Sequence, residues 1–168
     1  MEKRIVIKVD EYGSFDELAP MDRFLLEHAI KATETSYSPY SSFRVGAALR
    51  LTNGEIMSGS NQENAAYPSG LCAERVVLFH AQARYPDVPA EALAVYASSE
   101  DFKLDNPVTP CGACRQVMAE HESRHRRKMR IIMGGANGMV QITDGIENLL
   151  PLTFMLDKLK KRRKTNNE

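Results

Sequence analysis

Cysteine is scarce in this sequence, with three residues in 168, and tryptophan is absent. Three cysteines leave one thiol over in any set of disulfides, and a chain of this length does not need a disulfide framework, so we do not expect one. Long apolar runs are also missing. None reaches the roughly 18 residues of a membrane span, and the apolar run near the start is broken by Lys8 and Asp10. We therefore expect a protein of the reducing cytoplasm, with no signal peptide and no membrane partner.

An excess of charge of either sign is missing as well. Lys plus Arg and Asp plus Glu both number 22, so the net charge is zero, and overall charge gives no reason to expect binding to nucleic acid. Two basic runs remain, at residues 124–130 and 158–164. We interpret them as a solvated face and part of a disordered tail, with contact to RNA or DNA as the alternative.

The three cysteines stand in two short motifs. Cys72 is followed by Ala73 and Glu74, and Cys111 and Cys114 belong to the segment Pro-Cys-Gly-Ala-Cys. Cysteines three residues apart at the start of a helix lie on one face, about a turn apart. Three protein ligands leave the fourth position of a tetrahedral zinc open to water, which is the catalytic arrangement. Glu74 is not needed as a ligand, so it can carry a proton between water and substrate.

The charge of such a site also has an expected counterweight. Three thiolates around Zn²⁺ leave a formal charge of minus one. If Cys72 and Cys111 each open a helix, the positive ends of both helix dipoles lower the pKa values of the thiols. Arg75, three residues after Cys72, is placed to offset the remaining negative charge.

Other interpretations of the cysteines stay open at this point. A structural zinc would take a fourth ligand from one of the four histidines, His28, His80, His121 or His125. Three unrelated buried thiols are possible because cysteine is a common core residue. A redox Cys-x-x-Cys is the third alternative, although its neighbours show no thioredoxin-like strand.

Hydrophobic periodicity predicts three helices, at residues 20–33, 72–84 and 111–122. It predicts six strands, at residues 4–9, 45–51, 56–60, 92–98, 129–133 and 139–143, with a hairpin turn at Thr52-Asn53-Gly54. This order indicates an α/β fold, a layered α/β/α sandwich with a central mixed sheet. Because each cysteine helix lies between strands, we expect parallel strands beside it. The prediction is one domain over residues 1–168, with an N-terminal extension (1–16) and a basic, disordered tail (158–168).

A polar segment, residues 61–64, precedes the first cysteine helix. Its side chains are either ordinary turn residues or hydrogen-bonding partners of a polar substrate, and their position alone does not decide between the two.

Several motifs together resemble the small, homotetrameric cytidine deaminases. They are Tyr-Ser-Pro-Tyr-Ser-Ser-Phe-Arg-Val-Gly-Ala-Ala at 37–48, Asn-Gln-Glu-Asn-Ala-Ala-Tyr-Pro at 61–68, Gly-Leu-Cys-Ala-Glu-Arg at 70–75, Pro-Cys-Gly-Ala-Cys-Arg-Gln at 110–116 and Leu-Leu-Pro-Leu-Thr-Phe at 149–154. Cys-x-Glu followed by Pro-Cys-x-x-Cys is also the signature of zinc-dependent deaminases. The resemblance spans most of residues 21–155, and the order of the motifs makes it specific.

The resemblance implies an enzyme of pyrimidine salvage that deaminates cytidine and deoxycytidine to uridine and deoxyuridine with one Zn²⁺ per chain. Cys72, Cys111 and Cys114 would hold the zinc. Glu74 would carry the proton, and Arg75 would hydrogen-bond the thiolates.

The resemblance also implies the substrate contacts. Asn61 and Glu63 would bind the ribose 3′-hydroxyl, and Phe43 would pack on the pyrimidine. The remaining implied contacts are the backbone at Ala73 and Thr109, on the base edge, and the side chains of Phe154 and Tyr67, which would reach a neighbouring subunit's site in a homotetramer with shared active sites.

Departures from the family pattern are few. Thr109 stands where serine is frequent, and Ala66 stands where many relatives have a further cysteine. A 3′-hydroxyl contact reads ribose and deoxyribose alike, so the preferred sugar stays open.

Three alternative functions are kept. A same-fold deaminase of a modified nucleoside fits less well with Asn61 and Glu63, which suit a plain ribose. A deaminase of RNA or single-stranded DNA usually has histidine where this chain has Cys72. A non-catalytic zinc-binding domain gives no account of Glu74.

Overall fold

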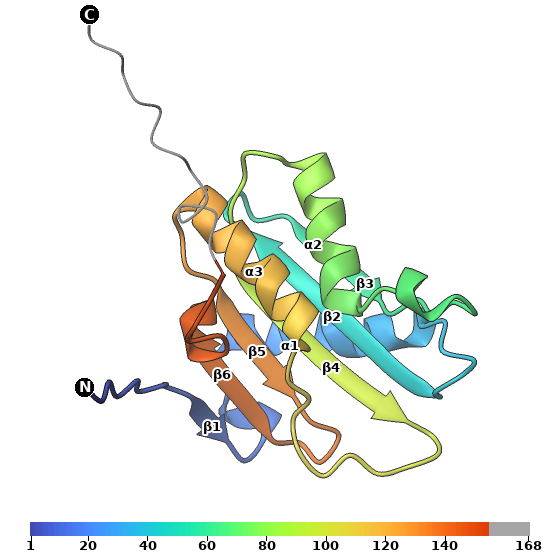
Figure 1. Cartoon of the computed structure of the whole chain (residues 1–168). Helices are drawn as coiled ribbons and strands as arrows, with labels where there is room; N and C mark the ends of the chain where they lie inside the picture. Colours follow the sequence, from blue (N-terminus) through green and yellow to red (C-terminus); the bar gives the residue numbers. More distant parts are fainter. Residues whose placement is uncertain (155–168) are drawn as a thin grey trace, which may run out of the picture.

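A mixed sheet of six strands runs through the centre of the structure, a computed structural model that describes residues 1–154 (Figure 1). The strand order is β1-β6-β5-β4-β2-β3. Among these described residues β4 and β5 are the parallel neighbours, and the other neighbouring strands are antiparallel. The strands are β1 (Asp10–Tyr12), β2 (Phe43–Leu51), β3 (Ile56–Ser60), β4 (Ala90–Ser99), β5 (Arg130–Gly134) and β6 (Val140–Asp144).

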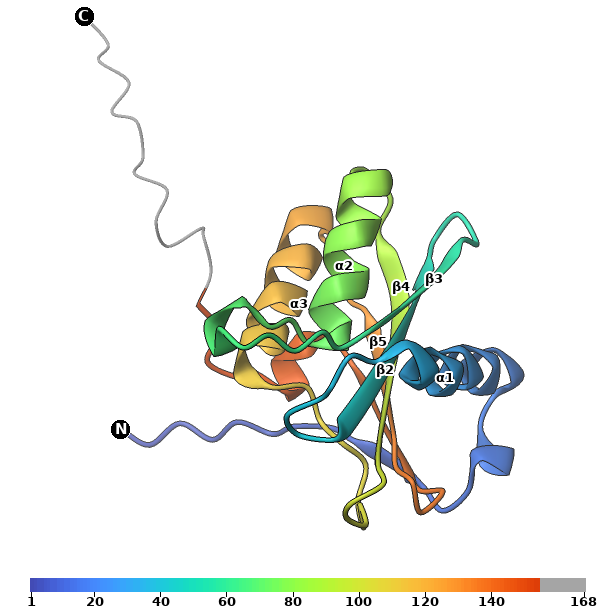
Figure 2. The same ribbon diagram turned by 90° about the vertical axis from the view of Figure 1, so that its right-hand side faces the viewer.

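Helices cover both faces of the sheet, as Figure 2 shows. Helix α1 (Pro20–Ala32) lies on one face, and α2 (Ala73–Arg84) and α3 (Gly112–His125) lie side by side on the other. Short 3₁₀ turns connect these elements: η1 (Phe15–Glu17), η2 (Thr33–Thr35), η3 (Tyr67–Ser69) and η4 (Ile146–Asn148). The predicted α/β/α sandwich with a mixed sheet is confirmed.

The sheet has a hydrophobic core on each face, and side chains that alternate along β4 contribute to both. Leu93 and Val95 face the core under α2 and α3, whereas Ala92 and Ala94 face the core under α1, as the two-residue period of a strand requires. Alanines on the second face let α1 approach closely. At Gly46 of β2, a Cβ would lie 2.0 Å from a backbone carbonyl oxygen of α1, so this position accepts no side chain.

Most of the predicted elements are present with small differences at their ends. Helix α3 runs three residues beyond its predicted end, to the left-handed residue Arg126 (φ 51°), which serves as its C-cap. Gly54 in the predicted hairpin turn has φ 89°. The predicted basic tail (158–168) lies outside the described residues.

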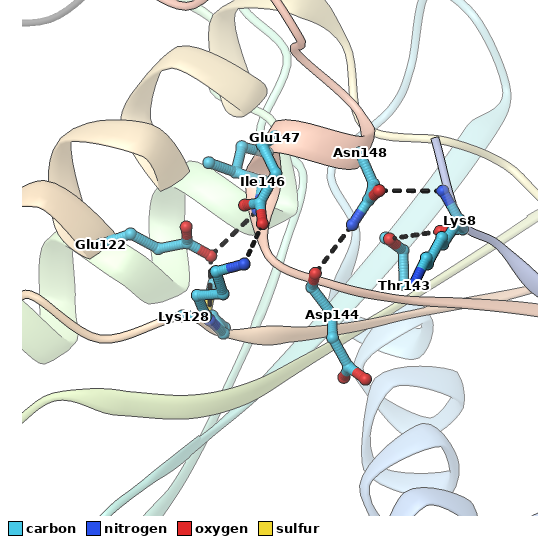
Figure 3. Close-up of polar contacts among 9 residues, drawn as sticks. Lys8, Glu122, Lys128, Thr143, Asp144, Ile146, Glu147 and Asn148 are labelled. Atoms are coloured by element: carbon cyan, nitrogen blue, oxygen red, sulfur yellow. Dashed lines mark hydrogen bonds and ion pairs between the residues drawn. The ribbon is translucent and has the colours of Figure 1, made fainter. Parts of the chain in front are cut away.

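The predicted strand at residues 4–9 is wrong. No strand is assigned to residues 1–9, and β1 begins at Asp10, where it pairs with Ile142 of β6. Just before β1, backbone groups of the chain form hydrogen bonds with side chains. The N–H of Lys8 donates to the Asn148 side chain at 2.9 Å, and the Lys8 carbonyl accepts from the Thr143 hydroxyl at 2.9 Å (Figure 3). These contacts replace the backbone ladder that a strand needs.

The predicted parallel neighbours are half right. Strands β4 and β5, which flank α3, pair in parallel. Strands β3 and β4, which flank α2, run in the same direction but are not neighbours, because β2 lies between them and is antiparallel to both.

A buried carboxylate joins the far end of α3 to the chain beyond it. Glu122 accepts hydrogen bonds from the backbone N–H groups of Met129, at 2.9 Å, and Ile146, at 3.1 Å (Figure 3). Beside it, Lys128 forms an ion pair with Glu147. Some of the charge in the basic run at residues 124–130 is therefore used inside the chain.

Among the described residues, no helix is both long enough and apolar enough to cross a membrane.

One histidine of α3 is buried against the sheet. His121 is 2% exposed, and its Nε2 atom accepts the backbone N–H of Ala90, the first residue of β4, at 2.9 Å. Its Nδ1 atom lies 3.1 Å from the Gln82 side-chain amide. Burial, with smaller effects from His125 and Arg124, lowers the pKa of His121 to about 4.

Because the pKa of His121 is lowered in the folded chain, we expect the free energy of unfolding to fall in mild acid. With its usual pKa of 6.5, His121 in the unfolded chain binds a proton below pH 6.5 while the folded chain stays neutral. The free energy of unfolding should therefore fall by up to about 3 kcal/mol as the pH drops from 6.5 to 4. His121→Gln should flatten this dependence in urea unfolding measured across that range. The exposed His80 provides the control: His80→Gln should keep the wild-type slope, and parallel curves for all three proteins would contradict the assignment.

Candidate metal centre and substrate cavity

Two helices begin at the three cysteines. Cys72 is the N-cap of α2 and Cys111 is the N-cap of α3, both with extended backbone, and Cys114 lies in the first turn of α3. The backbone N–H groups of Arg75 and Arg115 bond to the Cys72 and Cys111 carbonyls and close the first turns. The thiols thus lie at the positive ends of two helix dipoles, which stabilise negative charge.

The distances between the sulfur atoms fit one tetrahedral ion. Cys72 Sγ lies 3.8 Å from Cys111 Sγ, which lies 3.5 Å from Cys114 Sγ. A tetrahedral zinc with bonds of about 2.3 Å places its sulfur ligands about 3.8 Å apart, whereas a disulfide requires about 2.05 Å. All three thiols are free. The three residues therefore fit a zinc ion without rearrangement.

The ligand set among the described residues is the cysteine trio alone. Its three ligand atoms lie within 4.8 Å of one another, and within residues 1–154 this is the only such group of histidine, cysteine and acidic side chains. No histidine joins it, and His121 is engaged with the sheet. A structural zinc with a fourth histidine ligand therefore has no support in the geometry, and the fourth position is left to water or substrate.

The trio is arranged to carry negative charge. A hydrogen bond from Cys114 and contacts with Arg75 and Cys111 lower the pKa of Cys72 to about 5, although burial opposes this. The hydrogen bond with Cys72, together with burial, raises the pKa of the fully buried Cys114. The proton of this pair therefore remains on Cys114. The Arg75 guanidinium lies 3.8 Å from Cys72 Sγ, and its Nε atom is buried without a partner. A thiolate and a cation are thus already in place for a metal.

Glu74 is a buried carboxyl group next to the trio. It follows Cys72 by two residues, is 4% exposed and lines the cavity described below. Burial raises the pKa of Glu74, and the negative charge of Cys72 adds to this. A raised pKa makes the carboxylate a stronger base than an exposed one, which suits a group that takes a proton from water.

A cavity of about 570 Å³ opens onto the thiols, a volume suited to a nucleoside-sized ligand. It brings together most of the predicted site residues from separate parts of the chain: Phe43, Asn61, Glu63, Tyr67, Cys72, Glu74, Arg75, Thr109 and Cys111. Ala73 and Cys114 are fully buried. Phe154 does not line this cavity.

Asn61 is mostly occupied by the protein. Its Oδ1 atom accepts the Val45 N–H at 2.8 Å and the Ser36 hydroxyl at 2.5 Å, and its Nδ2 atom donates to the Phe43 carbonyl at 2.8 Å. One amide hydrogen remains for a ligand. Asn61 therefore fixes the start of β2, including Phe43, a task that the sequence did not indicate.

Glu63 holds the loop that contains Tyr40 and Ser41 at the cavity entrance. One carboxylate oxygen accepts the backbone N–H groups of Tyr40, at 2.8 Å, and Ser41, at 3.3 Å, and the other accepts the Ser41 hydroxyl. The Ser41 hydroxyl and then the Tyr40 N–H lower the pKa of Glu63, so Glu63 is an ionised acceptor at the rim. Its second oxygen keeps a free lone pair.

The two aromatic residues expected in a neighbouring site lie in different places. The Tyr67 ring packs edge-on against Tyr40, 5.9 Å between centroids, at the cavity of its own chain. Phe154 is 62% exposed and lies on the outside of α3, where the Gln116 side chain donates to its carbonyl at 2.9 Å. A contact with a neighbouring subunit stays a prediction for both.

Arg115 has no role in the predictions made from sequence, yet it joins three segments. Its guanidinium donates to the carbonyls of Pro110 and Leu149, both at 2.7 Å, and to the Thr109 hydroxyl at 3.2 Å. Arg115 thereby links the segment before α3, at Thr109 and Pro110, to the segment after η4, at Leu149. Its position directly after Cys114 is the one feature of the sequence that could have indicated this role.

Replacing Arg115 by methionine should destabilise the chain without removing its metal. Three hydrogen bonds from a charged group are lost, at a cost of about 2–4 kcal/mol in the free energy of unfolding, while the thiols are unchanged. Urea unfolding and zinc analysis measure the two effects. Arg127→Met, at an exposed position just beyond the same helix, is the control and should change stability by less than about 0.5 kcal/mol. Equal stability of both variants would contradict the role assigned to Arg115.

Residues 20–138 match the family described as the cytidine and deoxycytidylate deaminase zinc-binding region. A cytidine deaminase of Halalkalibacterium halodurans is 42% identical over 141 residues, which are 83% of this chain and 98% of that protein. A cytidine deaminase of Sporosarcina psychrophila is 40% identical over 136 residues, 80% of this chain and 92% of that protein. The crystal structure of a cytidine deaminase from Burkholderia pseudomallei is similar with a TM-score of 0.68 and 39% identity, covering 78% of this chain and 97% of the other.

Proposed function

Because this chain belongs to the cytidine and deoxycytidylate deaminase family, we propose that it converts free cytidine and deoxycytidine to uridine and deoxyuridine by hydrolytic deamination. One observation carries the proposal: three thiols spaced for zinc and a buried carboxyl group meet at a cavity of about 570 Å³. The reaction consumes one water and releases one ammonia.

The metal and one carboxyl group divide the chemistry. Cys72, Cys111 and Cys114 would hold Zn²⁺, which when bound lowers the pKa of a water molecule and so supplies a nucleophile near neutral pH. Glu74 takes one proton from that water and passes it to N3 of the base as C4 is attacked. It then carries the second proton to the amino group, and ammonia leaves. Burial of Glu74 supports this role because a raised pKa makes its carboxylate a stronger base toward the water proton.

Separate groups hold the sugar and the base. The free lone pair of Glu63 and the remaining amide hydrogen of Asn61 bind the ribose 3′-hydroxyl without releasing the loop that Glu63 holds. Phe43 packs on the pyrimidine, and the backbone at Ala73 and Thr109 contacts the base edge. Because the sugar contact is at the 3′ position, both nucleosides are accepted.

We also propose that the single deaminase domain works as a homotetramer with shared active sites. Exposed apolar side chains support association: Phe154, Leu152 and Phe79 are all exposed in the single chain, and their burial between copies of the chain would be favourable. Phe154 is held on the outside of α3 and away from its own cavity. Light scattering should give the mass of four chains.

We place the activity in pyrimidine salvage in the cytoplasm. Three free thiols at the metal centre are compatible with a reducing compartment, and the proposed substrates are free nucleosides.

Purified protein mixed with cytidine tests the proposal. We expect loss of the cytosine absorbance and appearance of uridine by chromatography, with the same result for deoxycytidine, and loss of activity after zinc is removed with a chelator. The absence of conversion in protein that contains one zinc per chain would overturn it.

Glu74→Gln tests the proton transfer separately. The amide keeps the shape of the side chain but cannot accept a proton, so we expect kcat to fall about 10²- to 10⁴-fold with zinc content and thermal midpoint retained. Glu55→Gln, at an exposed position in the β2–β3 turn, is the matched control and should be fully active. Normal turnover in Glu74→Gln would refute the assigned mechanism.

A further inference from the structure

Two phenylalanines from distant parts of the chain are stacked at the edge of the cavity. The rings of Phe43 and Phe102 lie 6.1 Å apart between centroids and are parallel to within 6°. Phe43 is the first residue of β2 and lines the cavity, whereas Phe102 belongs to the loop between β4 and α3 and does not line it. We propose that Phe102 is a positioning residue that holds the Phe43 ring in place for the pyrimidine. This inference rests on the proposed function, because it assumes that the base packs on Phe43.

The sheet register brings the loop to this place. Phe43 pairs with Ser99, the last residue of β4, so the loop leaves the sheet directly opposite Phe43. Next to the stack, Arg44 and Glu100 form an ion pair of 2.9 Å between β2 and the loop.

The far part of the loop is anchored as well. The Asn137 side chain donates to the Asp105 carbonyl at 2.6 Å. Leu104 and Val108 pack against the hydrophobic core under α2 and α3. Residues on both sides of Phe102 are thereby fixed, and its ring lies against Phe43.

Burial in the core does not account for Phe102. Its side chain is 48% exposed, and the loop residues around it, Asp101 and Lys103, are charged and exposed. A stack of parallel rings with this separation between centroids lies within the range of favourable aromatic pairs. The contact therefore acts mainly on Phe43, by limiting the orientations of its ring.

A ring fixed before the substrate arrives lowers the entropy cost of binding. Asn61 already fixes the backbone of Phe43 through its carbonyl, so Phe102 adds restraint to the side chain. The thiols and Glu74 lie at the starts of α2 and α3 and are not part of the stack. Loss of Phe102 should therefore weaken nucleoside binding and leave the chemical step unchanged.

The test compares Phe102→Ala, Phe102→Leu and Phe102→Tyr in the full zinc-loaded protein. We expect KM for cytidine and the inhibition constant for the product uridine to rise together, about threefold to tenfold, in the alanine variant. The kcat value should stay within about twofold. Leucine should give a smaller rise, and tyrosine, which keeps the ring, should restore wild-type values.

Phe24→Ala is the matched control, since Phe24 is 44% exposed and lies on α1, on the opposite face of the sheet. It should leave both constants unchanged. Unchanged constants in Phe102→Ala would overturn the inference, as would an equal rise in Phe24→Ala or a lower thermal midpoint with KM unchanged, which would mark Phe102 as merely structural. Failure of the proposed function itself would look different, because wild-type protein would then not convert cytidine at all.

Discussion

The meeting of three thiols at the start of two helices is the constraint on which the rest of the structure depends. Their sulfur atoms must lie about 3.8 Å apart to share one ion, so α2 and α3 must begin at the same edge of the sheet. They do so because α2 follows β3 and α3 follows β4, and these strands run in the same direction with β2 antiparallel between them. The same arrangement places the first residue of β2, Phe43, at that edge.

The electrostatics of the site follow from this geometry. Two helix N-termini and Arg75 favour negative charge on the sulfur atoms. Glu74 is buried beside them, where its carboxyl group is harder to ionise. Closely spaced thiolates and a buried carboxylate repel one another without a cation between them, so binding of the metal and stability of the fold are coupled.

Loops complete the cavity and are held by side chains rather than by secondary structure. Glu63 closes the loop at Tyr40 and Ser41, and Asn61 fixes the chain as it enters β2. On the other side, Arg115 ties the segment before Cys111 to the segment after η4. Each of these residues stands within a few positions of a strand end or a metal ligand, so the cavity and the metal centre are positioned by the same rigid elements.

The sequence by itself determined the order of the elements, because periods of two and 3.6 residues report which faces are buried. It also predicted that Cys72, Cys111 and Cys114 form one cluster with Glu74 beside it, since this prediction depends on residue type and short spacing. Only the tertiary structure decided that β3 and β4 are separated by β2, that β1 begins at Asp10, and that Phe102 meets Phe43. These features depend on which strands exchange hydrogen bonds and which loops meet across the sheet. Such contacts join residues far apart in the chain and leave no periodic signal along it.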